Sequence, residues 1–341
     1  MLQCIDLIVL GRFIDIYMIR SCTKAMGIDI SKTSVKAVCV DEKGIMDGYG
    51  IDDLPANAGD TEVILSLKKV LSQDCYNCDV VIGLRGLDVL TKNASFSNIK
   101  NLEDMGQAVE AEIEQLLPVD RSEVQVSWEV IKQDTEKVEA ILIAVPNKVI
   151  ERYKRLVDGV GLNIKSLEIN ALALKRSFSA EMKEKSMIVD VHADETDIEF
   201  YDREVLVLDK TIPMGGMSIT RSISKSLNIS MEEAEAKKRE SKIVDNKVFN
   251  EIYKKSVDEL ILEIIKTMSM AEIEYHIKPD EILLTGGDFN TQTVADYVIE
   301  NLSQLSIARL VVPRAVLMSN NIDKDLGDKL RLGNALGLAL K

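Results

Sequence analysis

Basic residues, aromatic residues and long apolar runs are all scarce in this sequence of 341 residues. Lysine and arginine total 42 against 56 aspartates and glutamates, which gives a formal net charge of −14. Binding to nucleic acid or to an anionic membrane surface requires basic residues that neutralise phosphates, so we expect no nucleic acid partner. The remaining partners are proteins and small ligands, and we expect membrane association only through partners.

The sequence has no apolar run long enough to cross a bilayer. A transmembrane helix needs about 20 mostly apolar residues, and charged side chains interrupt residues 1–25. This stretch also lacks the basic start and the small-residue cleavage site of a signal peptide. We interpret residues 1–25 as a leader or a misassigned start, with Met26 as the first native residue. The alternative is an amphipathic helix that docks on a partner or a membrane.

Cysteine and histidine are few, with five and two residues. Cys75 and Cys78 form a lone CxxC pair, whereas a zinc site needs two more ligands, so we interpret the pair as incidental. An odd number of cysteines without a secretory signal favours a reducing compartment.

Residues 26–40 predict two short strands joined by a tight polar turn. Apolar runs flank the turn, which reads Ser31-Lys32-Thr33-Ser34. Its backbone N–H groups and hydroxyls can donate to phosphate oxygens, and Lys32 or Lys36 can add positive charge. Asp29, at the end of the first strand, can hold a hydrated magnesium ion. An ordinary hairpin with a solvated turn is the alternative.

Residues 187–200 repeat this order of strand, aspartate, small turn and strand. Asp190 precedes the second turn, which contains His192 and Ala193. A third apolar strand runs into Gly286-Gly287, where backbone can lie against a flat ligand because glycine has no side chain. Two such hairpins followed by a strand and a glycine pair resemble the superfamily of sugar kinases, heat-shock chaperones and actin.

The region from residue 91 to residue 167 predicts a separate α+β unit of two layers. Its helices show apolar residues on one side, and its strands alternate or are continuously apolar. The expected elements are a helix over 102–117, a strand over 124–131, a strand over 138–145, a helix over 147–160 and a strand over 163–169.

Within the superfamily the sequence is similar to the PilM family of actin-like proteins of type IV pilus assembly, which is close to FtsA. The similarity includes the turn at residues 112–118 and the segment Ile-Pro-Met-Gly-Gly at residues 212–216. It implies an α/β, two-lobed actin-like ATPase (ribonuclease H-like) fold with an inserted α+β subdomain called 1C. The implied division is 26–90 and 168–185 for the first lobe, 91–167 for 1C, 186–331 for the second lobe and 332–341 for a C-terminal helix returning to the first lobe.

The resemblance also implies ATP and Mg²⁺ as cofactors, held between the lobes. Asp29 and Asp190 would hold the metal mostly through water, and Glu168 and Asn170 would position a hydrolytic water. Glu235 and Lys238 match a Glu-x-x-Lys pattern that holds the ribose and adenine edge, with a solvated helix face as the alternative. The implied nucleotide-binding set is Asp29, Ser31, Lys32, Thr33, Ser34, Lys36, Asp190, His192, Ala193, Gly215, Gly216, Glu235, Lys238, Gly286 and Gly287.

Some residues depart from the family pattern. Ser31 and His192 stand where the family has glycine, and Asp194 and Glu195 add negative charge beside the expected phosphates. Asn170 can orient water but is a poor base. We therefore expect ATP binding with weak or absent hydrolysis.

The leading hypothesis is a cytoplasmic, nucleotide-binding scaffold of type IV pilus assembly, peripheral to the inner membrane, that docks the cytoplasmic tail of a PilN-like inner-membrane protein. The pilus assembly motor ATPase is a further expected partner, and a homo-oligomer is a further option. One alternative is an FtsA-like ATP-hydrolysing filament former, which would carry a C-terminal amphipathic membrane helix. The other is the cytoplasmic domain of a GspL-like type II secretion protein, which would carry a following transmembrane helix. Neither helix is expected in the residues up to Lys341.

Overall fold

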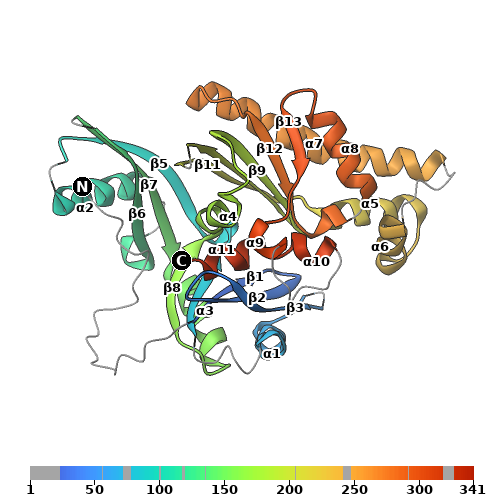
Figure 1. Ribbon diagram of the computed structural model, residues 1–341, viewed down its shortest axis with the longest axis horizontal. Helices are drawn as coiled ribbons and strands as arrows, with labels where there is room; N and C mark the ends of the chain where they lie inside the picture. Colours follow the sequence, from blue (N-terminus) through green and yellow to red (C-terminus); the bar gives the residue numbers. More distant parts are fainter. Residues whose placement is uncertain are drawn as a thin grey trace. The chain divides into compact units, whose positions relative to one another are not determined.

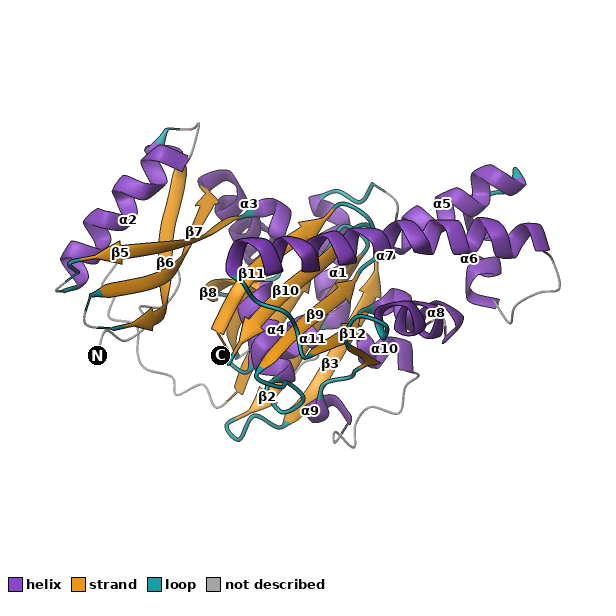
Figure 2. Ribbon diagram, turned by 90° about the horizontal axis from the view of Figure 1, so that it is seen from above, coloured by secondary structure: helices purple, strands orange, loops and turns teal. Residues whose placement is uncertain are grey.

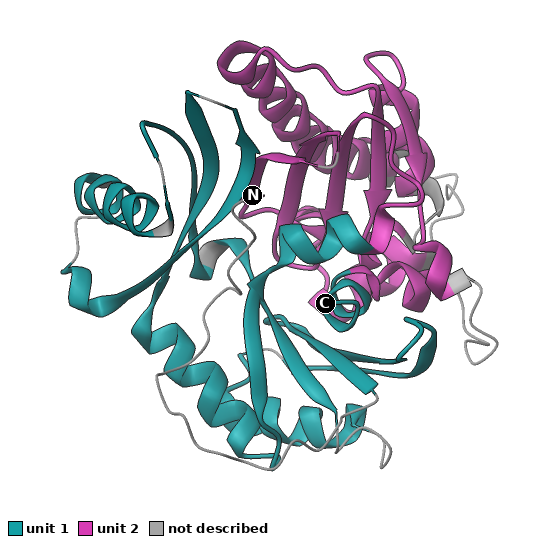
Figure 3. Cartoon of the chain, turned by 60° about the vertical axis from the view of Figure 1, so that its left-hand side comes forward, with its two compact units in different colours: residues 1–176, 334–341 teal, residues 177–333 magenta. Residues whose placement is uncertain are grey.

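Two five-stranded sheets with the same strand order form the framework of the computed structural model (Figure 1). The structure describes residues 24–55, 57–71, 78–99, 101–116, 120–134, 136–203, 205–240, 247–290, 292–317 and 326–341. The expectation for residues 1–25 therefore lies almost wholly outside the described residues. The described chain divides into two compact units, residues 1–176 with 334–341 and residues 177–333 (Figure 3).

The sheet of unit 1 has the order β3-β2-β1-β4-β8. The strands β1, β2 and β3 form an antiparallel meander, and β4 and β8 add to it in parallel. Parallel strands need a crossover between them, which α1 provides before β4 and the inserted region provides before β8. The bounds are β1 Lys24–Ile30, β2 Ser34–Asp41, β3 Met46–Asp53, α1 Asp60–Val70, β4 Asp79–Leu84 and β8 Ile164–Ile169.

The sheet of unit 2 repeats this topology as β11-β10-β9-β12-β13. Again three antiparallel strands are followed by two parallel ones, with helices as the crossovers. The strands are β9 Lys185–Val191, β10 Thr196–Asp202, β11 Val205–Ile212, β12 Glu281–Thr285 and β13 Ile307–Leu310. The helices are α5 Gly216–Leu227, α6 Met231–Glu240, α7 Lys247–Tyr275, α8 Gln292–Leu302, α9 Arg314–Leu317 and α10 Leu326–Leu330.

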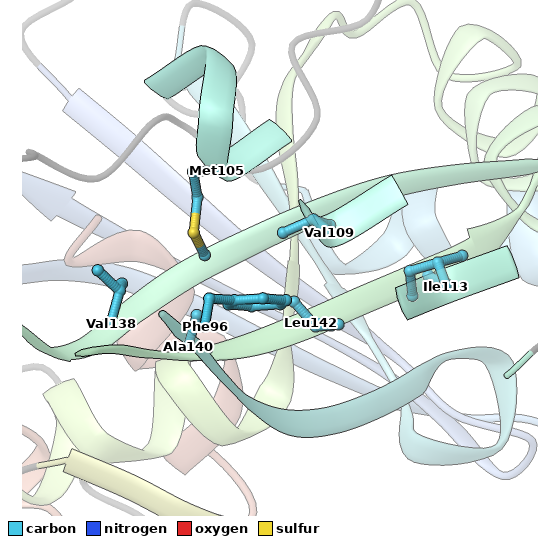
Figure 4. Packing of buried hydrophobic residues seen from close by; sticks show 8 residues of the cluster. Phe96, Met105, Val109, Ile113, Val138, Ala140 and Leu142 are labelled. Carbon is cyan, nitrogen blue, oxygen red and sulfur yellow. The ribbon is translucent and has the colours of Figure 1, made fainter. Parts of the chain in front are cut away.

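A three-stranded antiparallel sheet, β5-β7-β6, lies in the inserted region of unit 1. The helix α2 covers one face of this sheet, as Figure 2 shows. Met105, Val109 and Ile113 of α2 pack on Phe96 and on alternate residues of β7 (Figure 4). The bounds are β5 Leu90–Ser97, α2 Leu102–Leu116, β6 Val124–Gln133, β7 Lys137–Pro146 and α3 Asn147–Asp158.

The strand β5 was missed by the sequence analysis, so the inserted region begins with a strand and not with a helix. Its residues are mostly short and polar, and Phe96 is its one buried residue. The strand nevertheless pairs with β7 along its whole length. An edge strand needs backbone hydrogen bonds on one side only, so a weak apolar pattern suffices there.

The C-terminal helix α11, Gly333–Ala339, lies on the unit 1 sheet and on α4, Asn170–Phe178. A Cβ atom added at Gly337 would lie 1.9 Å from the carbonyl oxygen of Ala173 on α4, so the two helices cross closely there. On the other side, a Cβ atom at Gly27 of β1 would lie 2.0 Å from the carbonyl oxygen of Ala335. Backbone touches backbone at both places, which requires glycine.

No helix in the described part of the chain combines the length and the apolar character needed for a bilayer crossing.

We predict that Gly27→Ala destabilises the protein by about 1–3 kcal/mol, because the new methyl group would push α11 away from the sheet. The matched control is Gly48→Ala on β3, where no heavy atom lies within 4 Å of the added Cβ. Urea unfolding of both variants measures the difference. Equal free energies of unfolding would contradict the close packing of α11.

Candidate functional site

Asp29, the candidate metal ligand of the first hairpin, is completely buried and lies between two cations. Its Oδ2 atom is 2.7 Å from Nζ of Lys36, and its Oδ1 atom is 3.1 Å from a guanidinium nitrogen of Arg85. Lys36 is the cross-strand neighbour of Asp29, and Arg85 follows the end of β4. The protein itself therefore supplies the positive charge that this buried carboxylate requires.

Ser31 closes the first turn on itself. Its hydroxyl accepts hydrogen bonds from the backbone N–H groups of Thr33 and Ser34 and donates to the carbonyl oxygen of Ser34. Ser31 is not among the described residues with positive φ, so serine replaces glycine here without backbone strain. Lys32 is exposed at the tip of the turn. With two N–H groups already bonded internally, the role of this turn as a phosphate cradle stays a prediction.

His192, in the second turn, points back toward the sheet and lies between two buried aspartates. Its Nε2 atom is 3.2 Å from Asp190 and 3.3 Å from Asp197. Asp197 also accepts a hydrogen bond from the hydroxyl of Thr211 on the next strand. The imidazole thus occupies a position against Asp190, the candidate metal ligand of this hairpin.

Glu199 extends this acidic group along β10 and is completely buried. Burial raises the pKa of Glu199 well above its usual range. The nearby carboxylates of Asp197, Asp209 and Asp190 raise the pKa further. A carboxyl group in these surroundings favours its neutral, protonated form.

The glycines at the start of α5 are explained by close contacts with the second hairpin. The N–H group of Gly216 donates to the carbonyl oxygen of His192, and the N–H group of Met217 donates to that of Ala193. A Cβ atom at Gly215 would lie 2.3 Å from the same oxygen of His192. Carbonyl oxygens of the hairpin therefore accept hydrogen bonds from N–H groups at the start of α5. A bound anion would otherwise accept these hydrogen bonds.

Lys238 of α6 is buried and forms two ion pairs. Its Nζ atom is 2.8 Å from Asp288 and 2.9 Å from Glu235, and it donates to the carbonyl oxygen of Gly216 at 3.2 Å. Glu235 also accepts from the hydroxyl of Thr220. We call Glu235, Lys238, Asp288 and Gly216 the Lys238 site. Lys238 is therefore not on a solvated face, whereas Glu235 is partly exposed, and both side chains are bonded inside unit 2. Their role at the ribose and adenine edge stays a prediction.

Gly286 and Gly287 bring the turn after β12 close to β9. Gly286 has a φ of 108°, and a Cβ atom there would lie 2.3 Å from the carbonyl oxygen of Val191. A Cβ atom at Gly287 would lie 2.9 Å from Cγ of Arg331. Atoms of β9 therefore already lie against Gly286, and the side chain of Arg331 lies against Gly287.

Glu168 and Asn170, the candidate catalytic residues, differ in their surroundings. Both carboxylate oxygens of Glu168 accept hydrogen bonds from the guanidinium group of Arg176, and Lys341 lies 3.8 Å away. Asn170 is also buried and covers Gly83, yet neither its Oδ1 nor its Nδ2 atom has a hydrogen-bond partner among the described residues. Both oxygens of Glu168 are thus held by Arg176, whereas the polar atoms of Asn170 are buried. The role of the two residues in positioning a hydrolytic water stays a prediction.

The predicted residues form two groups, each within one unit. The first hairpin, Glu168 and Asn170 lie in unit 1, and the second hairpin, the Lys238 site and the glycine pair lie in unit 2. Among the described residues, no group of three or more histidine, cysteine, aspartate or glutamate side chains is arranged to hold a metal ion. Magnesium usually keeps several waters and needs only one or two carboxylates together with substrate phosphates, so this finding leaves the magnesium prediction untested.

Sequence reasoning missed Arg85 and Asp288, which pair with predicted residues. Arg85 directly follows a buried strand that lies beside β1, and Asp288 directly follows the glycine pair. Arg85 is a charged residue directly after an apolar strand, and Asp288 is one directly after the turn that follows such a strand. These positions were the available signal.

A family model described as type IV pilus assembly protein PilM matches residues 27–341. The cell division protein FtsA of Staphylococcus epidermidis (strain ATCC 12228) is 28% identical over 152 residues, which are 42% of this chain and 32% of that protein. FtsA of Bacillus subtilis (strain 168) is 30% identical over 107 residues, 30% of this chain and 24% of that protein. These matches span less than a third of either FtsA.

Among solved structures, the PilM-PilN type IV pilus biogenesis complex has a chain that matches with a TM-score of 0.79 at 18% identity, covering 93% of this chain and 96% of that chain. MreB 5 of Spiroplasma citri bound to AMPPNP matches with a TM-score of 0.53 at 11% identity, covering 93% and 95%. A ROK family glucokinase from Streptomyces griseus in complex with glucose and AMPPNP matches with a TM-score of 0.51 at 12% identity, covering 93% and 98%. These likenesses confirm the predicted α/β actin-like ATPase fold.

We predict that Asp29→Ala destabilises the protein by about 3–5 kcal/mol, because the change leaves Lys36 and Arg85 buried without their shared carboxylate. Asp47→Ala is the matched control. It breaks an exposed ion pair with Lys24 in the same sheet and should cost less than about 1 kcal/mol. Chemical unfolding measures both, and equal losses would show that the buried triad is energetically unimportant.

We also predict that Glu199→Gln stabilises the protein increasingly as the pH rises. Protonated Glu199 contributes stability that is complete below the pKa of the unfolded chain, 4.5, and is lost as the pH rises through the raised folded pKa. Glutamine cannot ionise and avoids this loss, which amounts to at most about 1.4 kcal/mol per pH unit. Denaturant unfolding from about pH 4.5 upward tests this difference. The exposed Glu232→Gln serves as control, and a gain independent of pH would contradict the assignment.

Proposed function

The chain belongs to the PilM family of type IV pilus assembly proteins, and we propose that it is an actin-like scaffold that docks the cytoplasmic tail of a PilN-like inner-membrane protein. The observation that carries this proposal is the family match over residues 27–341, which takes in both repeated sheets and the inserted region. In this proposal the protein lies at the cytoplasmic face of the inner membrane and is held there by its partner. The assembly motor ATPase and further copies of the chain are additional proposed partners.

The inserted region is the proposed receiving surface for the tail. It forms a layer of its own, with α2 packed on β5, β7 and β6 through a continuous apolar cluster. A separately packed layer gives a tail a rigid surface, which limits the conformational entropy lost on binding. The resemblance of residues 112–118 to the family supports the same region.

ATP with Mg²⁺ is the proposed ligand of the nucleotide-binding residues. Two proteins of the same fold, MreB 5 and the glucokinase, were crystallised with AMPPNP, an analogue of ATP. In unit 2, Lys238 and Glu235 would hold the nucleoside, and Asp190 would hold hydrated Mg²⁺, which neutralises phosphate charge. Because each of these residues already has an internal partner, we propose weak binding and weak or absent hydrolysis.

An FtsA-like filament former remains a weaker alternative, because the FtsA relatives match over less than half of this chain. The GspL-like alternative stays a second, weaker alternative.

We predict that a synthetic PilN-like tail peptide without tryptophan binds the full chain and changes the fluorescence of Trp128. Trp128 is the single tryptophan, lies on β6 and is half-buried against the inserted core. Its emission therefore reports on the inserted region alone, while calorimetry detects binding anywhere. We expect a saturable emission change with the same midpoint as the heat of binding.

Trp128→Phe is the matched control and should keep the heat but lose the optical signal. Heat without an emission change would place the tail elsewhere on the protein. The absence of heat at millimolar peptide would contradict the docking proposal.

A further inference from the structure

We propose that Asp288 is an internal competitor that occupies Lys238, and that nucleotide binds in unit 2 only when it displaces the Asp288 carboxylate. The inference rests on the proposed nucleotide binding and identifies the residue that limits its affinity. It is carried by the contacts of Lys238, by the space that Asp288 fills and by the sign of its charge.

Lys238 has no N–H group left for a ligand. An ammonium group carries three donors, and the structure gives it three acceptors, on Asp288, Glu235 and Gly216. The side chain is 4% exposed, so water does not substitute for a lost partner. A ribose or phosphate oxygen can therefore bind Lys238 only by replacing one of these three acceptors.

Asp288 is the acceptor that can leave most readily. Gly216 contributes a backbone carbonyl of α5, which cannot move without the helix. Glu235 is tied by the hydroxyl of Thr220 and by the guanidinium group of Arg239. Asp288, by contrast, lies on the short turn Gly287–Asn290, outside the long helices and the sheet of unit 2.

The carboxylate of Asp288 also fills the space beside the start of α5. A Cβ atom at Gly216 would lie 1.6 Å from Oδ1 of Asp288, so glycine at 216 makes room for this side chain. A nucleotide brought to Lys238 would meet both this volume and its negative charge. A neutral ribose hydroxyl is a weaker acceptor for an ammonium group than a carboxylate is, so the ion pair between Lys238 and Asp288 opposes the exchange.

Asp288→Ser tests the inference, because serine removes the carboxylate and frees one donor of Lys238. We expect the variant to bind Mg-ATP at least about tenfold more tightly than the native chain in calorimetry, a difference of about 1.4 kcal/mol. The matched control is Asp280→Ser, which removes an exposed aspartate just before β12, the strand that leads to Asp288. This variant should bind Mg-ATP like the native chain. Adding Lys238→Met to Asp288→Ser should abolish the gain.

Asp288→Asn covers the case in which the serine variant fails to fold, because asparagine keeps the shape and one acceptor but lacks the charge. It should show a smaller gain of the same sign. Equal, saturable binding by native chain and both Asp288 variants would overturn the inference and leave the nucleotide proposal intact.

Inorganic pyrophosphate separates the two proposals. A rise in the melting temperature of Asp288→Ser in millimolar pyrophosphate, absent in Asp280→Ser and in the double variant, supports Asp288 as the occupant of Lys238. If that rise occurs but no variant binds Mg-ATP, the nucleotide proposal fails while the occupancy of Lys238 stands. If neither pyrophosphate nor Mg-ATP distinguishes the Asp288 variants from the native chain, the inference is overturned.

Discussion

A charge that leaves water needs a counter-charge, and this requirement governs the candidate nucleotide-binding residues of both units. Asp29 lies between Lys36 and Arg85, and Lys238 lies between Asp288 and Glu235. Breaking such a buried pair by removing one partner is costly, so these residues hold their positions without a ligand. The protein thereby gains a preformed arrangement, and a nucleotide that bound to these residues would have to exchange existing contacts for new ones.

The repeated topology explains where these pairs lie. In each sheet an antiparallel hairpin precedes a parallel strand, so the hairpin turn lies beside the end of that strand. Arg85 extends from the end of β4 toward Asp29, and Gly286 follows β12 and lies against Asp190. The same geometry thus brings a hairpin aspartate close to the end of a parallel strand in both units. The residue at the strand end is Arg85 in unit 1 and Gly286 in unit 2.

Much of the fold could be predicted because apolar runs and turn residues within a short stretch of sequence indicate where strands, helices and turns form. The two hairpins, and the helices and strands expected over residues 102–117, 124–131, 138–145 and 147–160, follow from patterns within a few residues. β5 could not be predicted in this way, because its stability comes from pairing with β7, which lies about forty residues further along the chain.

The candidate site was predictable in its residue types but not in its contacts. Asp29 and Lys238 were found from their motifs, whereas their partners Arg85 and Asp288 come from distant parts of the chain. His192 lies against Asp197, which is on the following strand. The sequence of the turn alone does not show that these two side chains are neighbours. Partner choice among buried charges is a property of the folded arrangement, so a single sequence leaves it open.

The tight fit of α11 has a consequence for movement within unit 1. Gly27 and Gly337 hold the helix so close to β1 and α4 that even one added methyl group collides with backbone. Sliding the helix by one residue would bring Leu336 or Leu338 to the position against Ala173 that only glycine can fill. Shear between α11 and its sheet is therefore blocked, and any conformational change must carry the helix and the unit 1 sheet together as one rigid piece.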